Sequence, residues 1–256
     1  MSQWDPAQYL KFEDYRTRPA IDLIARTHIP VPGEIVDLGC GTGSVTRLLA
    51  RQFPDRSIIG VDNSAAMLEK ARALLPSVRF IESDMATFAL PALAALIFSN
   101  AALHWLPDHA SLFPALLARV APGGVLAVQM PRNHAAPSHT LVLEVARAAS
   151  FRAKIEAVFK TNPVETAEFY YDLLAPSAAT VDLWETEYLH VLEGENPVVE
   201  WTKGTVLRPV LGALDPVETA EFLTEYGRRI ALAYPKSPDG TTLFRFRRLF
   251  LVATAR

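Results

Sequence analysis

The first half of the chain alternates short apolar runs with segments of helical periodicity. Five apolar runs predict strands, at residues 34–38, 57–61, 78–81, 94–98 and 125–130. Three segments between them predict helices, at residues 44–52, 65–74 and 112–120. The run at 94–98 is entirely apolar, which is typical of a central strand in a parallel sheet. This alternation predicts an α/β fold with a doubly wound parallel sheet.

The pattern changes after Pro131. Later segments with mostly helical patterns are 140–159, 165–174 and 197–234. Two further segments predict strands, 181–192 and 243–255. We therefore expect seven strands, with helical insertions near the last ones. These insertions are expected over the carboxyl edge of the sheet, where open α/β folds bind ligands.

The composition limits the classes of function. The chain has 256 residues, half of them apolar, and a formal net charge of −3. It therefore lacks the globally basic character of a protein that holds a nucleic-acid backbone, and we expect no nucleic-acid partner. Cys40 is the only cysteine, which excludes an intrachain disulfide and a cysteine-based zinc site. No metal is expected.

The sequence favours a cytoplasmic location. Its first residues lack the basic start and apolar run of a signal peptide. The most membrane-like stretch, 88–106, is interrupted by Pro91, Asn100 and His104. We expect a soluble protein with no membrane partner.

A glycine-rich loop is the sharpest signal in the sequence. It reads Asp37-Leu38-Gly39-Cys40-Gly41-Thr42-Gly43 and lies between the first predicted strand and helix. Glycines at such a junction permit a tight turn and a close approach of a ligand to the backbone. A plain strand-to-helix turn is the alternative.

Polar residues at the ends of the next three strands make that alternative weaker. Asp62 follows the second strand, Asp84 the third and Asn100 the fourth. A carboxylate after the second strand of a nucleoside-binding fold is placed to accept both ribose hydroxyls. Asp84 is expected at the adenine amino group, with the backbone amide of Met85. Taken singly, Asp62 could instead be a helix N-cap and Asp84 a loop residue.

Two nucleoside cofactors compete for this loop. The dinucleotide fingerprint spaces its glycines as G-x-G-x-x-G, and here Gly43 comes one residue early, with Ser44 in the place of the third glycine. The pattern from Asp37 to Gly43 resembles motif I of the class I methyltransferases, in which the acid engages the aminopropyl end of S-adenosylmethionine. Methyl transfer from a sulfonium needs no cysteine nucleophile, so Cys40 is expected to be a small buried hydrophobe.

Longer motifs resemble the trans-aconitate 2-methyltransferase family over essentially the whole chain. They are Trp4-Asp5-Pro6, Arg16-Thr17-Arg18-Pro19, Trp105-Leu106-Pro107-Asp108-His109, Val128-Gln129-Met130-Pro131, Tyr170-Tyr171-Asp172, Leu207-Arg208-Pro209 and Arg248-Leu249-Phe250. The resemblance implies transfer of a methyl group from S-adenosylmethionine to a carboxylate of trans-aconitate. His104, where the family pattern has Gln, and Arg132, where it has an acidic or neutral residue, depart from it.

The resemblance implies a single class I domain over 1–256. Its parts are an N-terminal lid with helices at 1–30, a cofactor-binding half at 31–130, sheet completion with helical cap insertions at 131–242, and the last strand at 243–256. The expected cofactor-binding residues are Arg18, Asp37, Gly39, Gly41, Gly43, Asp62, Asn63, Asp84, Met85, Asn100 and Ala101.

Arginines and aromatic residues are the candidates for binding the substrate, because guanidinium groups hold carboxylates in a two-pronged geometry. The expected residues are Tyr9, Arg16, His104, Trp105, Trp201, Arg208 and Arg248. Arg16 and Arg18 are expected just before a helix that Pro19 starts. Trp201 and Arg208 are seven residues apart and would share one helical face.

Strand alternation places Arg245 and Arg247 on one face and Arg248 on the other. Solvated surface charges are the alternative for each arginine. Gln129, Asn133 and His139 either bind substrate or satisfy loop backbone groups.

No catalytic base is expected, because a carboxylate is already ionised at pH 7. Two other functions stay open. One is a class I methyltransferase with a different acceptor: a carrier-bound carboxyl, or a hydroxyl that would need a base such as His104. The other is a sensor that binds S-adenosylmethionine without catalysis.

Overall fold

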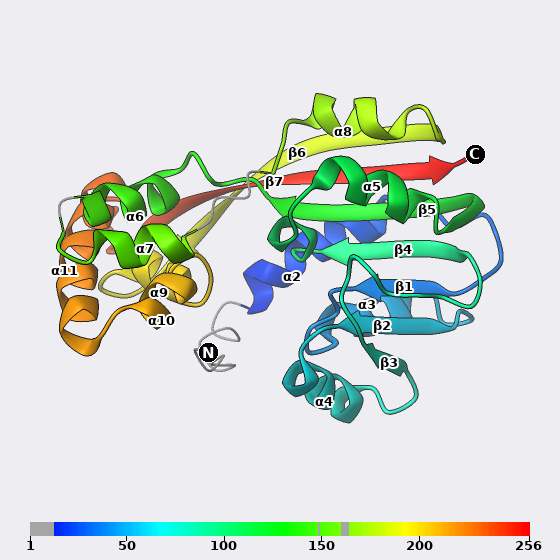
Figure 1. Cartoon of the computed structure of the whole chain (residues 1–256), viewed down its shortest axis with the longest axis horizontal. Helices are drawn as coiled ribbons and strands as arrows, with labels where there is room; N and C mark the ends of the chain where they lie inside the picture. Colours follow the sequence, from blue (N-terminus) through cyan, green and yellow to red (C-terminus); the bar gives the residue numbers. More distant parts are fainter. Residues whose placement is uncertain (1–12, 148, 160–163) are drawn as a thin grey trace. The chain divides into compact units, whose positions relative to one another are not determined.

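The computed structural model describes residues 13–147, 149–159 and 164–256. Seven strands form one sheet with the order β3-β2-β1-β4-β5-β7-β6 (Figure 1). Their bounds are β1 Ile35–Leu38, β2 Ile58–Asp62, β3 Arg79–Glu82, β4 Ala94–Asn100, β5 Val120–Pro131, β6 Ala178–Leu192 and β7 Thr242–Ala255. The five neighbouring strands β3, β2, β1, β4 and β5 are parallel to one another, and β7 is antiparallel to β5. The predicted seven-stranded, doubly wound sheet is confirmed.

The helices connect these strands. They are α2 Glu13–Ala25, α3 Ser44–Gln52, α4 Ala65–Leu74, η1 Leu103–Trp105, α5 His109–Leu117, α6 Pro137–Arg147, α7 Arg152–Val158, α8 Ala167–Leu174, α9 Pro197–Lys203, α10 Arg208–Ala213 and α11 Pro216–Ala233. The predicted helices at 44–52 and 65–74 agree with the structure at both ends. The structure divides the predicted helix at 140–159 into α6 and α7.

The two faces of the sheet have different neighbours. Register pairs Asp37 with Gly60 of β2, and Gly60 with Phe80 of β3, so these three residues share one face. On that face Phe80 packs against α4, and Asp37 bonds to α3. The opposite face of the same strands packs against α5 and α8 in a large apolar core. Burial on both faces explains why β1 and β4 are almost wholly apolar.

Contacts divide the chain into two compact units. The first, which we call the sheet unit, contains Arg16–Pro131, Val164–Thr186 and Arg248–Arg256. The second, the helical unit, contains, of the described residues, 13–15, 132–147, 149–159 and Glu187–Arg247. The helical unit has its own core, formed by side chains of α6, α7, α9, α10 and α11 and of the adjoining parts of β6 and β7.

One expected helix start is wrong. Pro19 lies inside α2, which already includes Glu13, so Arg16 and Arg18 are residues of the helix rather than of a preceding segment. Proline removes only its own N–H from the helical ladder, and a helix continues through it where packing compensates. Pro19 and its neighbour Ala20 are both buried. No helix in the described part of the chain is long and apolar enough to cross a membrane.

Candidate functional site

The glycine loop leaves β1 in a conformation that requires glycine. Gly39, Gly41 and Gly43 all have positive φ, between +55° and +81°. A Cβ on Gly39 would lie 2.2 Å from the Cβ of Ala102, whereas a Cβ on Gly41 would meet nothing within 4 Å. Gly39 is therefore needed for packing, and Gly41 borders open space. This space is where a ligand can approach the backbone.

Asp62, at the end of β2, is tied to this loop. Its Oδ2 accepts a hydrogen bond from the Gly41 N–H at 2.9 Å, and its Oδ1 accepts one from the Ser64 N–H at 2.9 Å. The N-cap of α4 is Ser64 and not Asp62, so the alternative role of Asp62 as a cap is wrong. A carboxylate has about four acceptor positions, and two are used here. The half-buried Asp62 therefore keeps capacity for hydroxyl groups of a ligand.

Asp37 is placed differently from Asp62. It is 1% exposed, and its Oδ2 accepts a hydrogen bond from the Thr46 hydroxyl of α3 at 2.6 Å. Burial raises the pKa of Asp37 to about 7, and the nearby charge of Asp62 adds to this increase while the Thr46 bond opposes it. Asp37 is thus a buried acid that holds the first turn of α3 and would gain from a cationic group nearby.

Cys40 is buried in the same loop. Burial and the charges of Asp37 and Asp62 raise the pKa of its thiol. A thiol held protonated in this way is a poor nucleophile. Cys40 is thus the small buried side chain that was expected.

Asp84 and its neighbours follow β3. The Asp84 Oδ1 accepts a hydrogen bond from the Ala86 N–H at 2.7 Å, which forms a local turn. The carboxylate remains exposed, as does Asn63 after β2. Met85 is 8% exposed, and its sulfur is near Gly39. These contacts bring the loops after β1 and β3 together.

Asn100 is the last residue of β4, and Ala101 follows it beside the glycine loop. Ala101 has φ of +52°, which is unusual for a residue with a Cβ. Its N–H donates to the carbonyl of Gln129 at 2.9 Å. The side-chain oxygen of Asn100 is buried and has no hydrogen-bond partner among the described residues. Strain and an unsatisfied acceptor at one strand end are features of ligand sites.

The 3₁₀ turn η1 carries His104 and Trp105. Their rings lie 4.7 Å apart, and Trp105 is 57% exposed. The His109 Nε2 bonds to the carbonyl of Leu103 at 3.1 Å, and its Nδ1 bonds to the Tyr170 hydroxyl at 2.6 Å. Because a carbonyl only accepts, Nε2 carries the proton and Nδ1 accepts from the tyrosine. Burial lowers the pKa of His109, which favours this neutral form.

This His109–Tyr170 pair is a structural link that residue patterns did not reveal. It joins η1 and the start of α5 to α8, which lie 61 residues apart in the sequence. The sequence contained both residues in family-like motifs but offered no signal that they meet. The pair positions the turn that carries His104 and Trp105.

The arginines near the end of the chain alternate as predicted. Arg245 and Arg247 are exposed, and Arg245 pairs with Glu187, whereas Arg248 is 4% exposed. The Arg248 Nη1 donates to the Oε1 of Gln129 at 3.2 Å. Arg248 therefore lies inside the sheet unit beside the ends of β5 and β4.

Trp201 and Arg208 do not share a helical face, contrary to expectation. Helix α9 ends at Lys203 and α10 begins at Arg208, because Gly204 and the turn after it interrupt the helix. Trp201 is 1% exposed, and its ring stacks on His190 at 4.8 Å in the core of the helical unit. Arg208 is exposed. The position of Trp201 favours a packing role.

The remaining expected residues lie near the start of the chain. Tyr9 falls outside the described residues. Arg16 is a residue of helix α2, and the structure does not describe its side chain. Arg18 is an exposed residue of the same helix.

Asn133 and His139 are in the helical unit. The Asn133 Oδ1 accepts from the Arg247 N–H at 3.0 Å, as a residue that satisfies backbone groups would. Burial lowers the pKa of His139 to about 4, and its Nδ1 lies 3.1 Å from the Ser138 hydroxyl.

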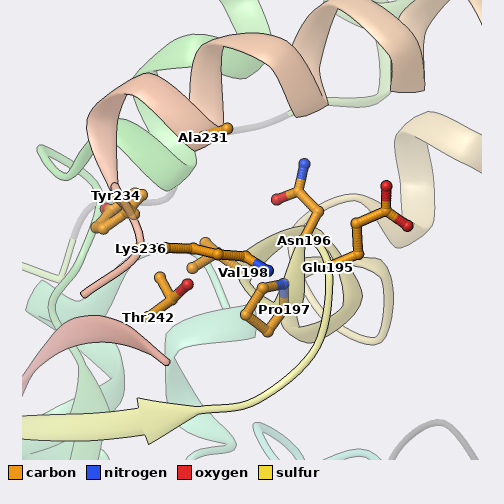
Figure 2. A pocket seen from close by; sticks show the side chains of 8 residues that line it. All are labelled: Glu195, Asn196, Pro197, Val198, Ala231, Tyr234, Lys236 and Thr242. Carbon is orange, nitrogen blue, oxygen red and sulfur yellow. The ribbon is translucent and has the colours of Figure 1, made fainter. Parts of the chain in front are cut away.

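A pocket of about 190 Å³ lies elsewhere in the helical unit (Figure 2). It is lined by Glu195, Asn196, Pro197, Val198, Ala231, Tyr234, Lys236 and Thr242. It contains one basic and one acidic side chain, so it lacks the cationic surplus that a polycarboxylate needs. None of its lining residues was expected in the site.

The residues at the carboxyl ends of β1, β2 and β4 fit a nucleoside with a cationic tail. Gly41 borders open space, Asp62 retains acceptor capacity, and the half-buried Asn100 has a buried acceptor oxygen that is unsatisfied among the described residues. The sheet order changes direction between β1 and β4, which is the ligand-binding position of open α/β sheets. No cluster of three or more His, Cys, Asp or Glu side chains in the described residues could hold a metal ion.

Comparison with known proteins supports this interpretation. The family model described as "Methyltransferase domain" matches residues 35–124. The chain is 48% identical over 254 residues to the trans-aconitate 2-methyltransferase of Acidovorax ebreus, covering 99% of this chain and 98% of that protein. It is 47% identical over 253 residues to the protein of the same name from Azoarcus sp., covering 99% of each.

Solved structures agree in fold. The YcgJ protein of Bacillus subtilis superposes with a TM-score of 0.58 at 13% identity, covering 93% of this chain and 98% of that one. An S-adenosylmethionine-dependent methyltransferase from Mesorhizobium loti has a TM-score of 0.51 at 21% identity, covering 93% and 97%. The chain is therefore an S-adenosylmethionine-dependent class I methyltransferase, and it belongs to the trans-aconitate 2-methyltransferase family.

Proposed function

We propose that this protein transfers the methyl group of S-adenosylmethionine to a carboxylate of trans-aconitate. The products are a monomethyl ester and S-adenosylhomocysteine. The observation that carries this proposal is 47–48% identity, over nearly the full length, to proteins named for that reaction. Identity of this extent includes both the sheet unit and the helical unit.

The chemistry suits residues that position rather than catalyse. When bound, S-adenosylmethionine supplies a methyl group activated by its sulfonium. A carboxylate with a reference pKa near ~4 is already the nucleophile at pH 7, so no base is required. The protein has to align a carboxylate oxygen with the S–CH₃ bond and remove part of its water.

We assign the cofactor to residues around the glycine loop. In this proposal Asp62 accepts the ribose hydroxyls, Asp84 and Met85 bind adenine, and Asp37 favours the cationic aminopropyl end from its buried position. Further cofactor contacts come from Arg18, Gly39, Gly41, Gly43, Asn63, Asn100 and Ala101.

We assign the substrate to basic and aromatic residues. Arg248 is the strongest of these candidates, because its guanidinium is buried beside the ends of β4 and β5. The other candidates are Tyr9, Arg16, His104, Trp105 and Arg208, and Trp201 is the weakest because it is enclosed in a core.

The direct test is incubation with methyl-labelled S-adenosylmethionine and a panel of di- and tricarboxylic acids, with products identified by mass. We expect one methyl group on trans-aconitate and a higher kcat/KM for it than for other acids of the panel. Asp62→Ala is the matched control, because it should lower turnover of every acid. Turnover of a different acid only, or of none, would contradict the proposed substrate.

A second measurement separates carboxylate from hydroxyl acceptors. With a carboxylate acceptor, the His104→Ala variant should keep a flat rate between about pH 6.5 and 8.5. A loss of several orders of magnitude, with a histidine-like pKa in the wild-type profile, would indicate a hydroxyl acceptor. A small-molecule acceptor also agrees with the net charge of −3, whereas a nucleic acid does not. A cytoplasmic location stays a prediction.

A further inference from the structure

The side chain of Gln129 has a buried hydrogen-bond donor that the described residues do not satisfy. Gln129 is fully buried on β5, and its Oε1 accepts from the Nη1 of Arg248 at 3.2 Å. Because arginine can only donate, this bond fixes which end of the amide is oxygen. The NH₂ group therefore points away from Arg248. Its nitrogen is buried and has no acceptor among the described residues.

The position of this donor connects it to the expected cofactor site. Register pairs Gln129 with Asn100 of β4 and with Phe250 of β7, so the three side chains stand on one face of the sheet. Asp37 stands on the same face, because it pairs with Phe98, two residues before Asn100. The Gln129 carbonyl also accepts from the Ala101 N–H. The unsatisfied donor is thus next to the strand ends assigned to S-adenosylmethionine.

The positive charge near the Gln129 amide indicates which kind of acceptor would bind to its NH₂ group. The positively charged guanidinium of Arg248 is bonded to the amide oxygen through Nη1, and Arg248 as a whole is 4% exposed. A positive charge behind a neutral donor favours an anion in front of that donor. An ionised carboxylate is an acceptor-only group, which matches an NH₂ that can only donate.

We propose that the Gln129 amide donates to a carboxylate of the substrate that is not methylated, and that Arg248 orients this amide. The inference rests on the proposed function, because it takes its substrate class from there. Donors and positive charge reduce the nucleophilicity of a carboxylate oxygen, so the reacting carboxylate lies elsewhere. Gln129 is then a specificity-determining residue. Arg248, besides its proposed role in binding the substrate, is a positioning residue for the Gln129 amide.

The first test removes the donor, together with the oxygen that accepts from Arg248, at nearly constant side-chain size. Gln129→Met should raise the KM for trans-aconitate by roughly 10- to 100-fold, the range for a hydrogen bond to a charged group. Gln129→Glu should raise it further, because the new carboxylate pairs with Arg248 and repels the substrate. The affinity for S-adenosylhomocysteine, measured by calorimetry, should stay within about twofold. Gln52→Met, on the exposed end of α3, is the matched control.

Substrate selectivity gives a readout that a purely structural role would not change. Crotonate has the alkene and one carboxylate but lacks the others. Gln129→Met should reduce the preference for trans-aconitate over crotonate, and Arg248→Lys should reduce it less than Arg248→Met. An unchanged KM together with a lower melting temperature would overturn the inference, because Gln129 would then only support the strands.

A binding measurement separates failure of this inference from failure of the proposed function. Trans-aconitate is titrated into the wild type and into Gln129→Met, each saturated with S-adenosylhomocysteine. Weaker binding to the variant supports the inference even if the wild type does not methylate this acid. Equal binding to both overturns it while the proposed function stands. No binding of any di- or tricarboxylate to the wild type overturns both.

Discussion

The sheet unit and the helical unit use buried polar groups in different ways. In the helical unit the buried Tyr226 hydroxyl donates to the Ser138 carbonyl at 2.8 Å, and the buried Thr202 hydroxyl donates to the Val198 carbonyl at 2.9 Å. In the sheet unit, Asn100 and Gln129 have buried atoms without a partner among the described residues. The helical unit also has two such atoms, one in Asn133, two residues after β5, and one in the His190 ring that stacks on Trp201, so the difference lies in the strand-end position of Asn100 and Gln129.

This difference indicates which unit is organised around a ligand. The helical unit has a core rich in aromatic rings, including Trp201, Phe222, Tyr226 and Phe244. Such a core contributes stability through packing and buried area. The sheet unit instead leaves donors, acceptors and a buried acid at the ends of its parallel strands. A buried polar group that has no partner within the protein reduces its stability. Such a group is retained where a bound ligand provides the partner.

The largest expected effect is on packing in the helical unit. Trp201→Ala should lower the free energy of unfolding by about 3–5 kcal/mol, because it leaves a large cavity beside His190 and Phe244. Denaturant unfolding followed by circular dichroism would measure this. Trp105→Ala is the control, because the exposed Trp105 should change stability by less than about 0.5 kcal/mol. A stable Trp201 variant with a strongly raised KM would show that this ring binds substrate instead.

The next effect is on cofactor affinity in the sheet unit. Asp62→Ala should weaken binding of S-adenosylmethionine by about 1.5–3 kcal/mol, the range for hydrogen bonds to a charged group. The change also removes the bond from the Gly41 N–H, so calorimetry should be combined with a melting temperature. Asp84→Ala should have a smaller effect, since that carboxylate is exposed. Unchanged affinity in a folded Asp62 variant would remove it from the site.

A third change should stabilise the protein while harming its function. The pKa of Asp37 is raised from 3.8 to about 7, so the folded state keeps a proton that the unfolded state loses as pH rises between these values. The contribution of Asp37 to stability is thus present at low pH and lost as pH rises through about 7. Asp37→Asn keeps an oxygen that accepts from the Thr46 hydroxyl. Because asparagine does not ionise, the variant does not lose this stability as pH rises. At pH 8 it should raise the free energy of unfolding by on the order of 1–3 kcal/mol.

The same substitution should weaken S-adenosylmethionine binding, because the cationic aminopropyl end loses a nearby negative charge. Unfolding at pH 5 and pH 8 provides the internal control, since the difference between variant and wild type should shrink at pH 5. A variant less stable than wild type at pH 8 would mean that Asp37 is ionised and well paired in the folded protein.

The smallest effect is expected at Arg208. A buried pair with a substrate carboxylate would contribute several kcal/mol, but Arg208 is exposed. Exposed ion pairs contribute about 0–1 kcal/mol, so Arg208→Ala should lower kcat/KM for trans-aconitate by roughly fivefold or less. Arg208→Lys should recover most of this loss. A decrease of 100-fold or more would show that substrate binding encloses this side chain.

Much of the sheet unit follows from local sequence. Apolar runs bounded by turn residues determine β1, β2 and β4, because only such runs can be buried on both faces of a parallel sheet. Glycines determine the loop after β1, because its backbone adopts positive φ at Gly39, Gly41 and Gly43. Alternation alone also placed Arg248 on the face opposite Arg245 and Arg247. Each of these features depends only on residues that are close to one another along the sequence, within one strand or one loop.

Tertiary structure decided the features that depend on contacts between distant residues. Nothing near Trp201 and Arg208 in the sequence predicts that one is enclosed in a core and the other exposed, since both lie in one helical pattern. Pro19 starts a helix by local rules, yet burial of its neighbourhood keeps it inside α2. The pairs His109–Tyr170 and Gln129–Arg248 join residues 61 and 119 positions apart. The physical reason is that hydrogen bonding and desolvation act over a few ångströms in space, whereas a sequence pattern reports only neighbours along the chain.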